Sequence, residues 1–271
     1  IYIQIDEELT LRELLYGLML RSGNDAALMV ASFVSGNEEK FVELMNKKAD
    51  ELGMTSTYFC NPHGLDEKCE NLSTAYDMAI LTKYANKIEE YQKIVSTKRY
   101  ILKTNFKTYD WYNKNKLLTT YKYTTGGKTG FTEKAKRTLV TTASKDDLNL
   151  IVVTLNDPND FTTHKNLYEY GFNNYTKYII LNKNTFNLKN EYYNQKLYIK
   201  NNYYYPLRDN ELNIITLKIK LNIINNPKNN EKVGYIEVIY DKTIVHTEDI
   251  FIKIENKKKD SFFKRILDLI L

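Results

Sequence analysis

The stretch YTTGGKTGFTEKAKRTLVTTASK, from Tyr123 to Lys145, contains the strongest signals for the fold of the first half of the chain. Its glycine-rich start contains Gly127-Lys128-Thr129, which matches the end of the phosphate-binding motif G-x-x-x-x-G-K-[ST]. The spacing excludes that motif, because its first glycine would fall on Lys122 and the preceding residues do not read as a buried strand. The stretch therefore does not predict a nucleotide site.

An alternating pattern follows the glycines and predicts two antiparallel strands. Apolar and polar residues alternate over 137–143 and again over 149–155, and the polar tetrapeptide SKDD joins the two runs. We therefore predict a β-hairpin. The segment FTTHKNLYEYGF predicts a helix that ends the domain near Phe172.

Helical patterns precede the strands. Thr10 and Glu13 form a capping-box pair before a helix that stops at the pentapeptide RSGND. Asn24 or Asp25 is suited to cap a second helix, so Ser22-Gly23-Asn24 is predicted to form a tight turn between two buried helices. Two further helices are predicted over 38–52 and 74–85. Helices, then antiparallel strands, then a helix indicate the α+β class.

The second half of the chain has a different residue pattern. Beyond Asn173, short alternating segments such as LKIKLNII, VGYIEVIY and IFIKIE are separated by clusters of Asn, Pro and Lys, which predicts a small all-β domain. The chain closes with an amphipathic helical pattern after Lys257-Lys258-Lys259. The predicted organisation is a partial catalytic domain over 1–173, an all-β domain over 174–256 and a tail over 257–271.

Composition narrows the classes of function. The chain has 271 residues and is 42% hydrophobic, so it can bury a core and two domains are expected. Its net charge is +5, and its Lys and Arg residues are scattered along the sequence. This distribution does not favour a nucleic-acid-binding function. The three histidines lie far apart without an H-E-x-x-H motif, so no metal and no cofactor is predicted. Cys60 and Cys69 are the only two cysteines, and the sequence leaves open whether they form a bridge or stay free.

Six segments carry a resemblance to a known family. In chain order they are LLYGLMLRSGNDAA, NPHGLD, STAYDMAIL, NKNKLL, GGKTGFT and SKDDLNLIVVTLND. Together they resemble the serine-type D-alanyl-D-alanine carboxypeptidases, the low-molecular-weight penicillin-binding proteins, over roughly residues 1–172, with a weaker resemblance in the β domain. The resemblance implies a penicillin-binding/β-lactamase-like domain with a helical cluster and an antiparallel sheet.

The resemblance also implies roles for the S-x-N turn and the lysine. In the family the nucleophile is the Ser of an S-x-x-K motif, whose Lys acts as base. Ser22 would relay protons between that lysine and the leaving amine, and Asn24 would fix the neighbouring side chain and the substrate amide. Lys128 would place positive charge near the reacting centre and the substrate carboxylate.

The residues after Lys128 would hold the substrate. By the same resemblance, Thr129 would hydrogen-bond the terminal carboxylate, and Gly130 would leave room for the peptide to lie along the strand edge. The backbone N–H of Phe131 would donate to the oxyanion. The chain departs from the family at Thr125, where an acidic residue is often found.

The nucleophile itself is missing from its expected place. It should lie several dozen residues before Ser22, where the chain offers only twenty-one. The only literal S-x-x-K is Ser261-Phe262-Phe263-Lys264, which we interpret as coincidence because a nucleophile needs a packed supporting shell. The chain lacks a starting Met and opens at Ile1 in what reads as a strand, which indicates a fragment or a processed product that is inactive as it stands.

These patterns favour one function over two alternatives. The main hypothesis is a carboxypeptidase that acts outside the cytoplasmic membrane, removes the terminal D-alanine from peptidoglycan pentapeptides and binds β-lactams. The alternative is a non-catalytic cell-wall-binding pseudoenzyme of the same fold. A β-lactamase or β-lactam sensor is disfavoured by NPHGLD, NKNKLL and the β domain. The tail over 257–271 is predicted to lie on an anionic membrane surface.

Overall fold

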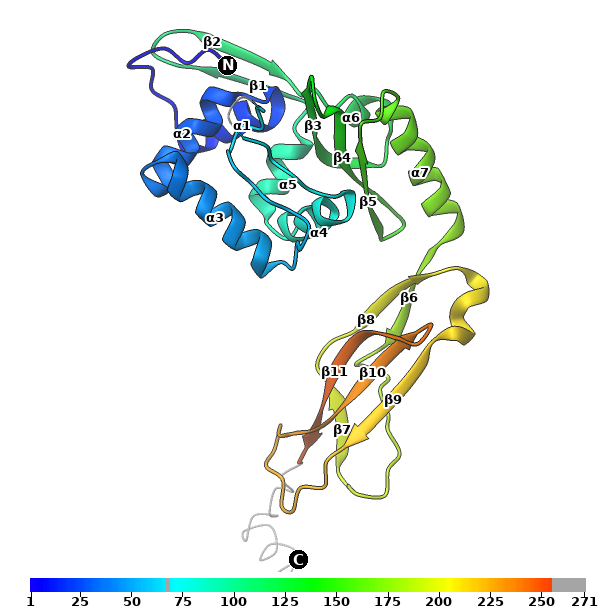
Figure 1. Cartoon of the computed structure of the whole chain (residues 1–271). Coiled ribbons are helices and arrows are strands. Elements are labelled where there is room, and N and C mark those ends of the chain that lie inside the picture. Colours follow the sequence, from blue (N-terminus) through cyan, green and yellow to red (C-terminus); the bar gives the residue numbers. More distant parts are fainter. Residues whose placement is uncertain (67–68, 255–271) are drawn as a thin grey trace, which may run out of the picture. The chain divides into compact units, whose positions relative to one another are not determined.

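A computed structural model describes residues 1–66 and 69–254. The chain divides into two compact units, the first from Ile1 to Asn174 and the second from Tyr175 onward (Figure 1). The amphipathic tail predicted over 257–271, with the tetrapeptide Ser261–Lys264, lies outside the described residues. In residues 1–66 and 69–254, no helix is long and apolar enough to cross a membrane.

Five helices form the helical part of the described first unit. They are α1 (Leu11–Arg21), α2 (Asn24–Ser35), α3 (Glu38–Glu51), α4 (Ala75–Ala85) and α5 (Glu89–Ser96). The capping box of α1 is confirmed, because Thr10 Oγ1 accepts from the Glu13 N–H and the Glu13 carboxylate accepts from the Thr10 N–H. The sequence patterns missed α5, whose N-cap is Ile88 and has no capping side chain.

Two expectations for the N-terminal part are wrong. Helix α2 begins at Asn24 behind Gly23, and no side chain caps it. Because Asn24 is already helical it cannot act as the N-cap, and the Asp25 carboxylate instead accepts hydrogen bonds from the backbone N–H groups of Ile3 and Ala26. The segment that opens at Ile1 forms no strand; its Ile1 and Ile3 pack against the buried cluster of α1 and α2.

An antiparallel sheet forms the other part of the first unit. It consists of β3 (Thr124–Thr132), β4 (Lys136–Lys145) and β5 (Leu148–Leu155), in the order β3-β4-β5. The predicted hairpin is confirmed: Lys145 pairs with Leu148, and Asp146 and Asp147 take φ angles of 49° and 63°, as a tight two-residue turn requires. The α+β prediction is thereby confirmed.

Helices cover both faces of this sheet. Helix α7 (Asp160–Asn174) lies on the face that carries the Thr141 side chain, with which His164 and Tyr168 of α7 are hydrogen-bonded. Gly126 faces the other side, where Val95 of α5 lies against it. A separate hairpin of β1 (Arg99–Lys103) and β2 (Thr108–Tyr112) packs on α1, and a short α6 (Leu117–Thr120) leads into β3.

The second unit is built from strands. Its larger sheet has the order β7-β11-β10-β9, from β7 (Lys196–Ile199), β11 (Thr243–Lys253), β10 (Lys232–Tyr240) and β9 (Thr216–Leu221). The smaller pairs β6 (Thr176–Leu181) with β8 (Tyr203–Leu207), and a 3-10 turn η1 (Asp209–Ile214) follows β8. The hydrophobic residues of this unit without exposed surface are Leu207, Val233, Ile236, Val238, Ile250 and Ile252. The alternating segments of the sequence correspond to β9, β10 and β11, whereas β6, β7 and β8 carry no such pattern in the prediction.

Candidate functional site

Ser22 closes helix α1 in an unusual backbone conformation. It has φ 58° and ψ 49°, in the left-handed region. The N–H groups of Ser22 and Gly23 donate to the carbonyls of Leu18 and Gly17, the pattern of a Schellman C-terminus, where glycine is the usual left-handed residue. A serine in this conformation costs roughly 1 kcal/mol. Such a strained residue in a turn is a candidate for function.

Lys128 lies on β3, which has the single neighbour β4 in the described sheet. Its Nζ donates to Ser22 Oγ at 2.5 Å and to the backbone carbonyl of Thr129 at the same distance. Burial, reinforced by the positive charge of Lys114, lowers the pKa of Lys128 to about 8. The ammonium is therefore held in reach of the Ser22 hydroxyl and is easier to deprotonate than an ordinary lysine.

Gly127 explains part of the glycine-rich sequence before Lys128. Its φ is +142°, and a Cβ atom built on it would lie 2.3 Å from the Val140 carbonyl oxygen and 2.8 Å from Thr141 Cα. Only glycine fits such a backbone at such a distance. The close approach of β3 to β4 sets the path of the strand directly before Lys128.

A pocket of about 720 Å³ contains all the residues predicted to act. Ser22 lines it from the end of α1, and Asn24 lines it from the start of α2. The strand β3 lines it with Lys128, Thr129, Gly130 and Phe131. The structure thus brings together residues that lie 106 positions apart in the sequence.

A disulfide-closed loop contributes another wall of the pocket. Cys60 and Cys69 are bonded, which answers the question that the sequence left open. His63, Gly64, Leu65, Asp66 and Asn71 from this region line the pocket. Asn61, only 5% exposed, accepts from the Gly64 N–H and donates to the Leu65 carbonyl, so its side chain holds the loop in shape.

Comparison with known proteins identifies the family of the chain. A family model described as D-alanyl-D-alanine carboxypeptidase matches residues 1–159. The chain belongs to this family. The resemblance seen in the sequence is therefore confirmed, and so is the assignment to serine-type D-Ala-D-Ala carboxypeptidases at the level of the family.

Individual relatives agree with the family assignment. D-alanyl-D-alanine carboxypeptidase DacF of Bacillus subtilis is 43% identical over 154 residues, which are 56% of this chain and 39% of the relative. DacC of Escherichia coli is 34% identical over 176 residues, 63% of this chain and 43% of the relative. The chain thus spans about two fifths of the length of these curated carboxypeptidases.

Solved structures also match the fold, and one of them covers more of the chain than the first unit. Penicillin binding protein 5 from Haemophilus influenzae superposes with a TM-score of 0.71 at 26% identity, covering 90% of this chain and 73% of that one. A D-alanyl-D-alanine carboxypeptidase from Mycobacterium tuberculosis gives a TM-score of 0.57 at 31% identity, covering 61% of this chain and 65% of that one. The predicted penicillin-binding type of fold is confirmed.

Several pocket residues of this carboxypeptidase-family chain were not singled out from the sequence. Lys114 and Lys116 belong to NKNKLL, and His63 and Asp66 belong to NPHGLD; the sequence analysis treats both segments only as flanks of the motifs. The signal that could have pointed to these four residues is that they lie in segments that carry the family resemblance. Arg137 and Asp160, which also line the pocket, lie in no such motif.

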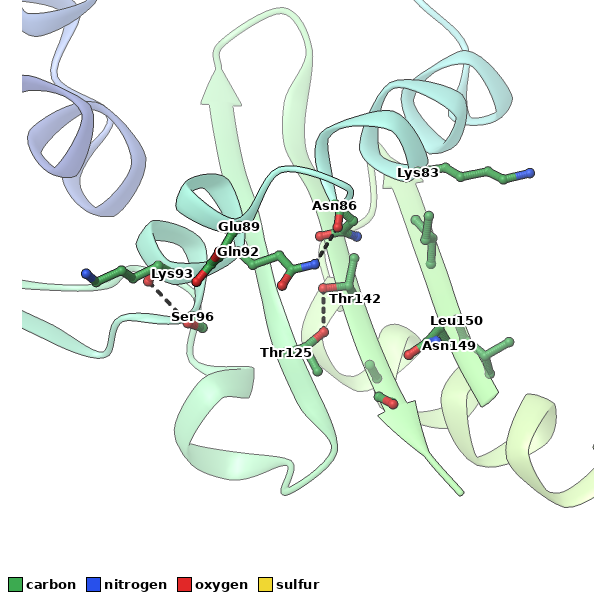
Figure 2. A pocket seen from close by; sticks show the side chains of 13 residues that line it. Lys83, Asn86, Glu89, Gln92, Lys93, Ser96, Thr125, Thr142, Asn149 and Leu150 are labelled. Carbon is green, nitrogen blue, oxygen red and sulfur yellow. Dashed lines mark hydrogen bonds between the residues drawn. The ribbon is translucent and has the colours of Figure 1, made fainter. Parts of the chain in front are cut away.

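A second cavity of about 920 Å³ lies elsewhere in the first unit and shares no lining residue with the first. Figure 2 shows it between the sheet and the helices α4 and α5, with Asn86 at the end of α4 and Gln92 on α5. Thr125 Oγ1 donates to Thr142 Oγ1 at 2.7 Å there, so Thr125, at which the resemblance implied an acidic residue, ties β3 to β4 (Figure 2). None of the predicted site residues lines this cavity.

The histidines and carboxylates of the described residues do not assemble into a metal site. Within residues 1–66 and 69–254, no group of three His, Cys, Asp or Glu side chains is placed to hold a metal ion. His164 has no exposed surface, and its two ring nitrogens contact Thr141 Oγ1 at 2.7 Å and Thr154 Oγ1 at 3.0 Å. Its place is therefore structural, beneath the sheet.

Proposed function

We propose that the protein is a serine-type carboxypeptidase that removes the terminal D-alanine from peptidoglycan stem peptides and is acylated by β-lactams. The observation that carries the proposal is the hydrogen bond from Lys128 Nζ to Ser22 Oγ in the shared pocket. A hydroxyl that is bonded to a lysine with a pKa of about 8 can accept and pass on a proton near neutral pH. Ser22 therefore acts as the relay toward the leaving amine.

The free edge of β3 is suited to an extended peptide. In the described sheet β3 pairs only with β4, so its other edge can accept a peptide as an added strand. Lys128 and Thr129 would then receive the terminal carboxylate, and Gly130 lets the peptide backbone approach. The N–H of Phe131 is the oxyanion donor in this arrangement, and Asn24 binds the substrate amide.

The bond-breaking step needs a nucleophile that pairs with these groups. In the family this is the serine of S-x-x-K. Its hydroxyl oxygen would attack the carbonyl of the penultimate residue, its proton would pass to the departing D-alanine amine, and water would then hydrolyse the ester. Residues 1–271 contain no S-x-x-K before Ser22. The proposal therefore requires one in the full-length protein, in contact with Ser22 and Lys128.

Release of D-alanine from a D-Ala-D-Ala-terminated pentapeptide by the full-length protein is the direct test. We expect release, together with covalent labelling by penicillin at a serine of an S-x-x-K motif, mapped by mass spectrometry. Binding of the peptide without release or labelling would support the pseudoenzyme alternative. Absence of binding, release and labelling would contradict both.

The substrate fixes where the protein acts. Peptidoglycan stem peptides lie outside the cytoplasmic membrane, so an extracytoplasmic location follows from the proposed reaction. We further propose that residues 257–271, which are outside the described residues, attach the protein to an anionic membrane through the apolar side of their helical pattern. Flotation with anionic vesicles tests this: deletion of 257–271 should abolish partitioning, and equal partitioning of both forms would rule the attachment out.

A further inference from the structure

The larger sheet of the second unit has one buried face and one face that is accessible to solvent (Figure 1). Ile250 and Ile252 of β11 have no exposed surface and belong to the core of the unit. Because side chains alternate along a strand, Phe251 between them points the opposite way. Its register partner Tyr198 on β7 shares that side, and both rings are partly exposed. We call this side the open face.

Lysines from all four strands of the sheet point to the open face. On β9, Lys218 and Lys220 flank Ile219, whose register partner is the fully buried Ile236 of β10. The same alternation applies along the other strands. The charged residues of the open face are, in chain order, Lys196, Lys200, Lys218, Lys220, Lys232, Glu237, Asp249 and Lys253.

Contacts place two of these lysines that lie at strand ends. Lys200 Nζ lies 3.7 Å from the centroid of the Phe251 ring, and Lys232 Nζ lies 2.6 Å from Asp249 Oδ1. Of the ion pairs between described residues, only that of Lys232 with Asp249 lies on the open face. Most of the ammonium groups there therefore have no carboxylate to neutralise them within the described part of the chain.

The open face holds the positive charge of the second unit. Residues 175–254 include twelve Lys and Arg against eight Asp and Glu. Six of these cations and two of these anions lie on the open face, so the whole excess of four positive charges is there and the remainder is balanced. The sheet register thus gathers lysines that are scattered along the sequence.

Protection of a sheet edge explains only part of this arrangement. Lysines on an edge strand prevent pairing with other chains, which accounts for Lys218 and Lys220 of β9. Strands β10 and β11 lie inside the sheet and need no such protection, yet they contribute Lys232 and Lys253. The charge extends across the sheet, as a binding surface for an anion requires.

Charge argues against two occupants from this protein. A second copy of the open face would bring the same positive excess against the first. The segment 257–271 has five Lys and Arg against two Asp, so it would be repelled as well. Charge complementarity therefore favours an anionic partner.

The aromatic rings among these lysines distinguish between anionic partners. They are only partly exposed, and ammonium groups lie over Phe251 and, at 5.9 Å from the ring centroid, over Tyr235. Rings shielded in this way are not suited to insert into lipid, but their edges can pack against the carbon chain of a polyol. Lysines two residues apart on one strand are about 6.6 Å apart, which suits a chain with one anion in each short repeat.

We propose that the open face binds a phosphodiester-linked polyol polymer, with its lysines contacting the phosphates and its rings contacting the carbon chain. This binding is separate from the proposed carboxypeptidase reaction, because no residue of the open face lines the pocket of Ser22 and Lys128. Charges spread over a surface attract such a polymer, so its affinity falls as the salt concentration rises.

Binding of poly(glycerol phosphate) to the full-length protein, measured by calorimetry, is the test. We expect the wild type to bind the polymer and not neutral dextran, and to bind it more weakly as NaCl is raised. The variant Lys218→Gln/Lys220→Gln/Lys253→Gln should bind at least about 10-fold more weakly than the wild type. The three lysines are exposed, so its melting temperature should change little.

A control variant removes the same charge elsewhere. Lys103→Gln/Lys177→Gln/Lys183→Gln changes three exposed lysines outside the open face and should bind within about 2-fold of the wild type. Equal weakening in both variants would mean attraction by net charge alone and would overturn the proposal. A wild type that does not bind the polymer, or that binds dextran equally well, would also overturn it.

Two further measurements separate this proposal from its neighbours. Protein without residues 257–271 is mixed with anionic vesicles, and a preference for these vesicles over the polymer that depends on the three open-face lysines would assign the face to a membrane and overturn the proposal. Release of D-alanine from a soluble peptide should be the same in the wild type and both triple variants. Failure of the polymer binding therefore leaves the proposed function intact.

Discussion

Lys128 Nζ on β3 donates a hydrogen bond to Ser22 Oγ in the turn between α1 and α2, across 106 positions of sequence. The contact joins the helical part of the first unit to the edge strand of its sheet. Each partner is held by its own backbone: Ser22 by the left-handed turn, and Lys128 by the close approach of Gly127 to β4. The site therefore depends on two local geometries that are set independently.

The glycine before Lys128 should be irreplaceable. At Gly127 an added Cβ would meet backbone atoms at 2.3 and 2.8 Å with φ at +142°, so we expect Gly127→Ala to lower the free energy of unfolding by about 2–5 kcal/mol. Gly36→Ala is the control: φ there is +85° with nothing within 4 Å, so the cost should be about 1 kcal/mol. Urea unfolding of both variants measures the difference. Equal losses would contradict this account of β3.

His164 should make the first unit sensitive to mild acid. Burial lowers the pKa of His164 from 6.5 to about 4, despite the opposing attraction of Asp160 and Asp157. The folded state then binds fewer protons than the unfolded state between these values, so the free energy of unfolding should fall as the pH drops from 6.5 to 4. This loss of unfolding free energy, caused by the lowered pKa of His164, reaches about 3 kcal/mol.

The variant His164→Gln isolates that contribution. Its free energy of unfolding should depend less steeply on pH between 6.5 and 4 than that of the wild type, whatever its absolute stability. His246→Gln, in the second unit, should keep the wild-type slope of the first unit. Identical slopes for wild type and His164→Gln would show that His164 is not the group responsible.

The disulfide should stabilise a wall of the pocket. Cys60 and Cys69 are nine positions apart, and closing a loop of about ten residues contributes about 2–3 kcal/mol in the chain-entropy account. We expect the Cys60→Ser/Cys69→Ser variant to lose this amount and to bind the peptide more weakly, because residues of the loop line the pocket. Reductant should lower the melting temperature of the wild type only. A wild-type melting temperature that does not change on adding reductant would contradict the expectation.

Carboxylate binding should weaken in alkali. Lys128 has a pKa of about 8 in the free protein, and a bound carboxylate favours its ammonium form and raises that pKa. The affinity should therefore be constant well below pH 8 and fall as the pH rises through 8. Titrations between pH 6 and 10 measure this, and Lys128→Ala should remove the dependence. An affinity that is flat over the whole range in the wild type would refute the assignment.

Much of the fold could be predicted because its signals are local. Thr10 with Glu13 marks the start of α1, and SKDD between two alternating runs marks the hairpin of β4 and β5. Helix α5 carries no such signal, since Ile88 takes its N-cap position. The prediction that Asn24 caps α2 is wrong for a physical reason: Gly23, in an extended conformation, takes the N-cap position, so Asn24 is already the first helical residue.

Some residues of the candidate site could likewise be predicted from local sequence signals, and others could not. Ser22, Asn24 and Lys128 could be named from short motifs with matching flanks, and the structure brings them to one pocket. Arg137 and Asp160 could not, because their pairing depends on the register of β4 and on where α7 begins. Neither is visible in a linear pattern. The Cys60–Cys69 pairing likewise needed the path of the loop between them.

The rate of covalent labelling by a fluorescent penicillin tests the central claim most directly. It is measured on the full-length wild type, on Lys128→Ala and on Lys103→Ala, the last a control at an exposed lysine of β1. We predict that the wild type and Lys103→Ala are labelled at the same rate and that Lys128→Ala is labelled at least about 100-fold more slowly, with little change in melting temperature. Labelling of Lys128→Ala at the wild-type rate would contradict the account.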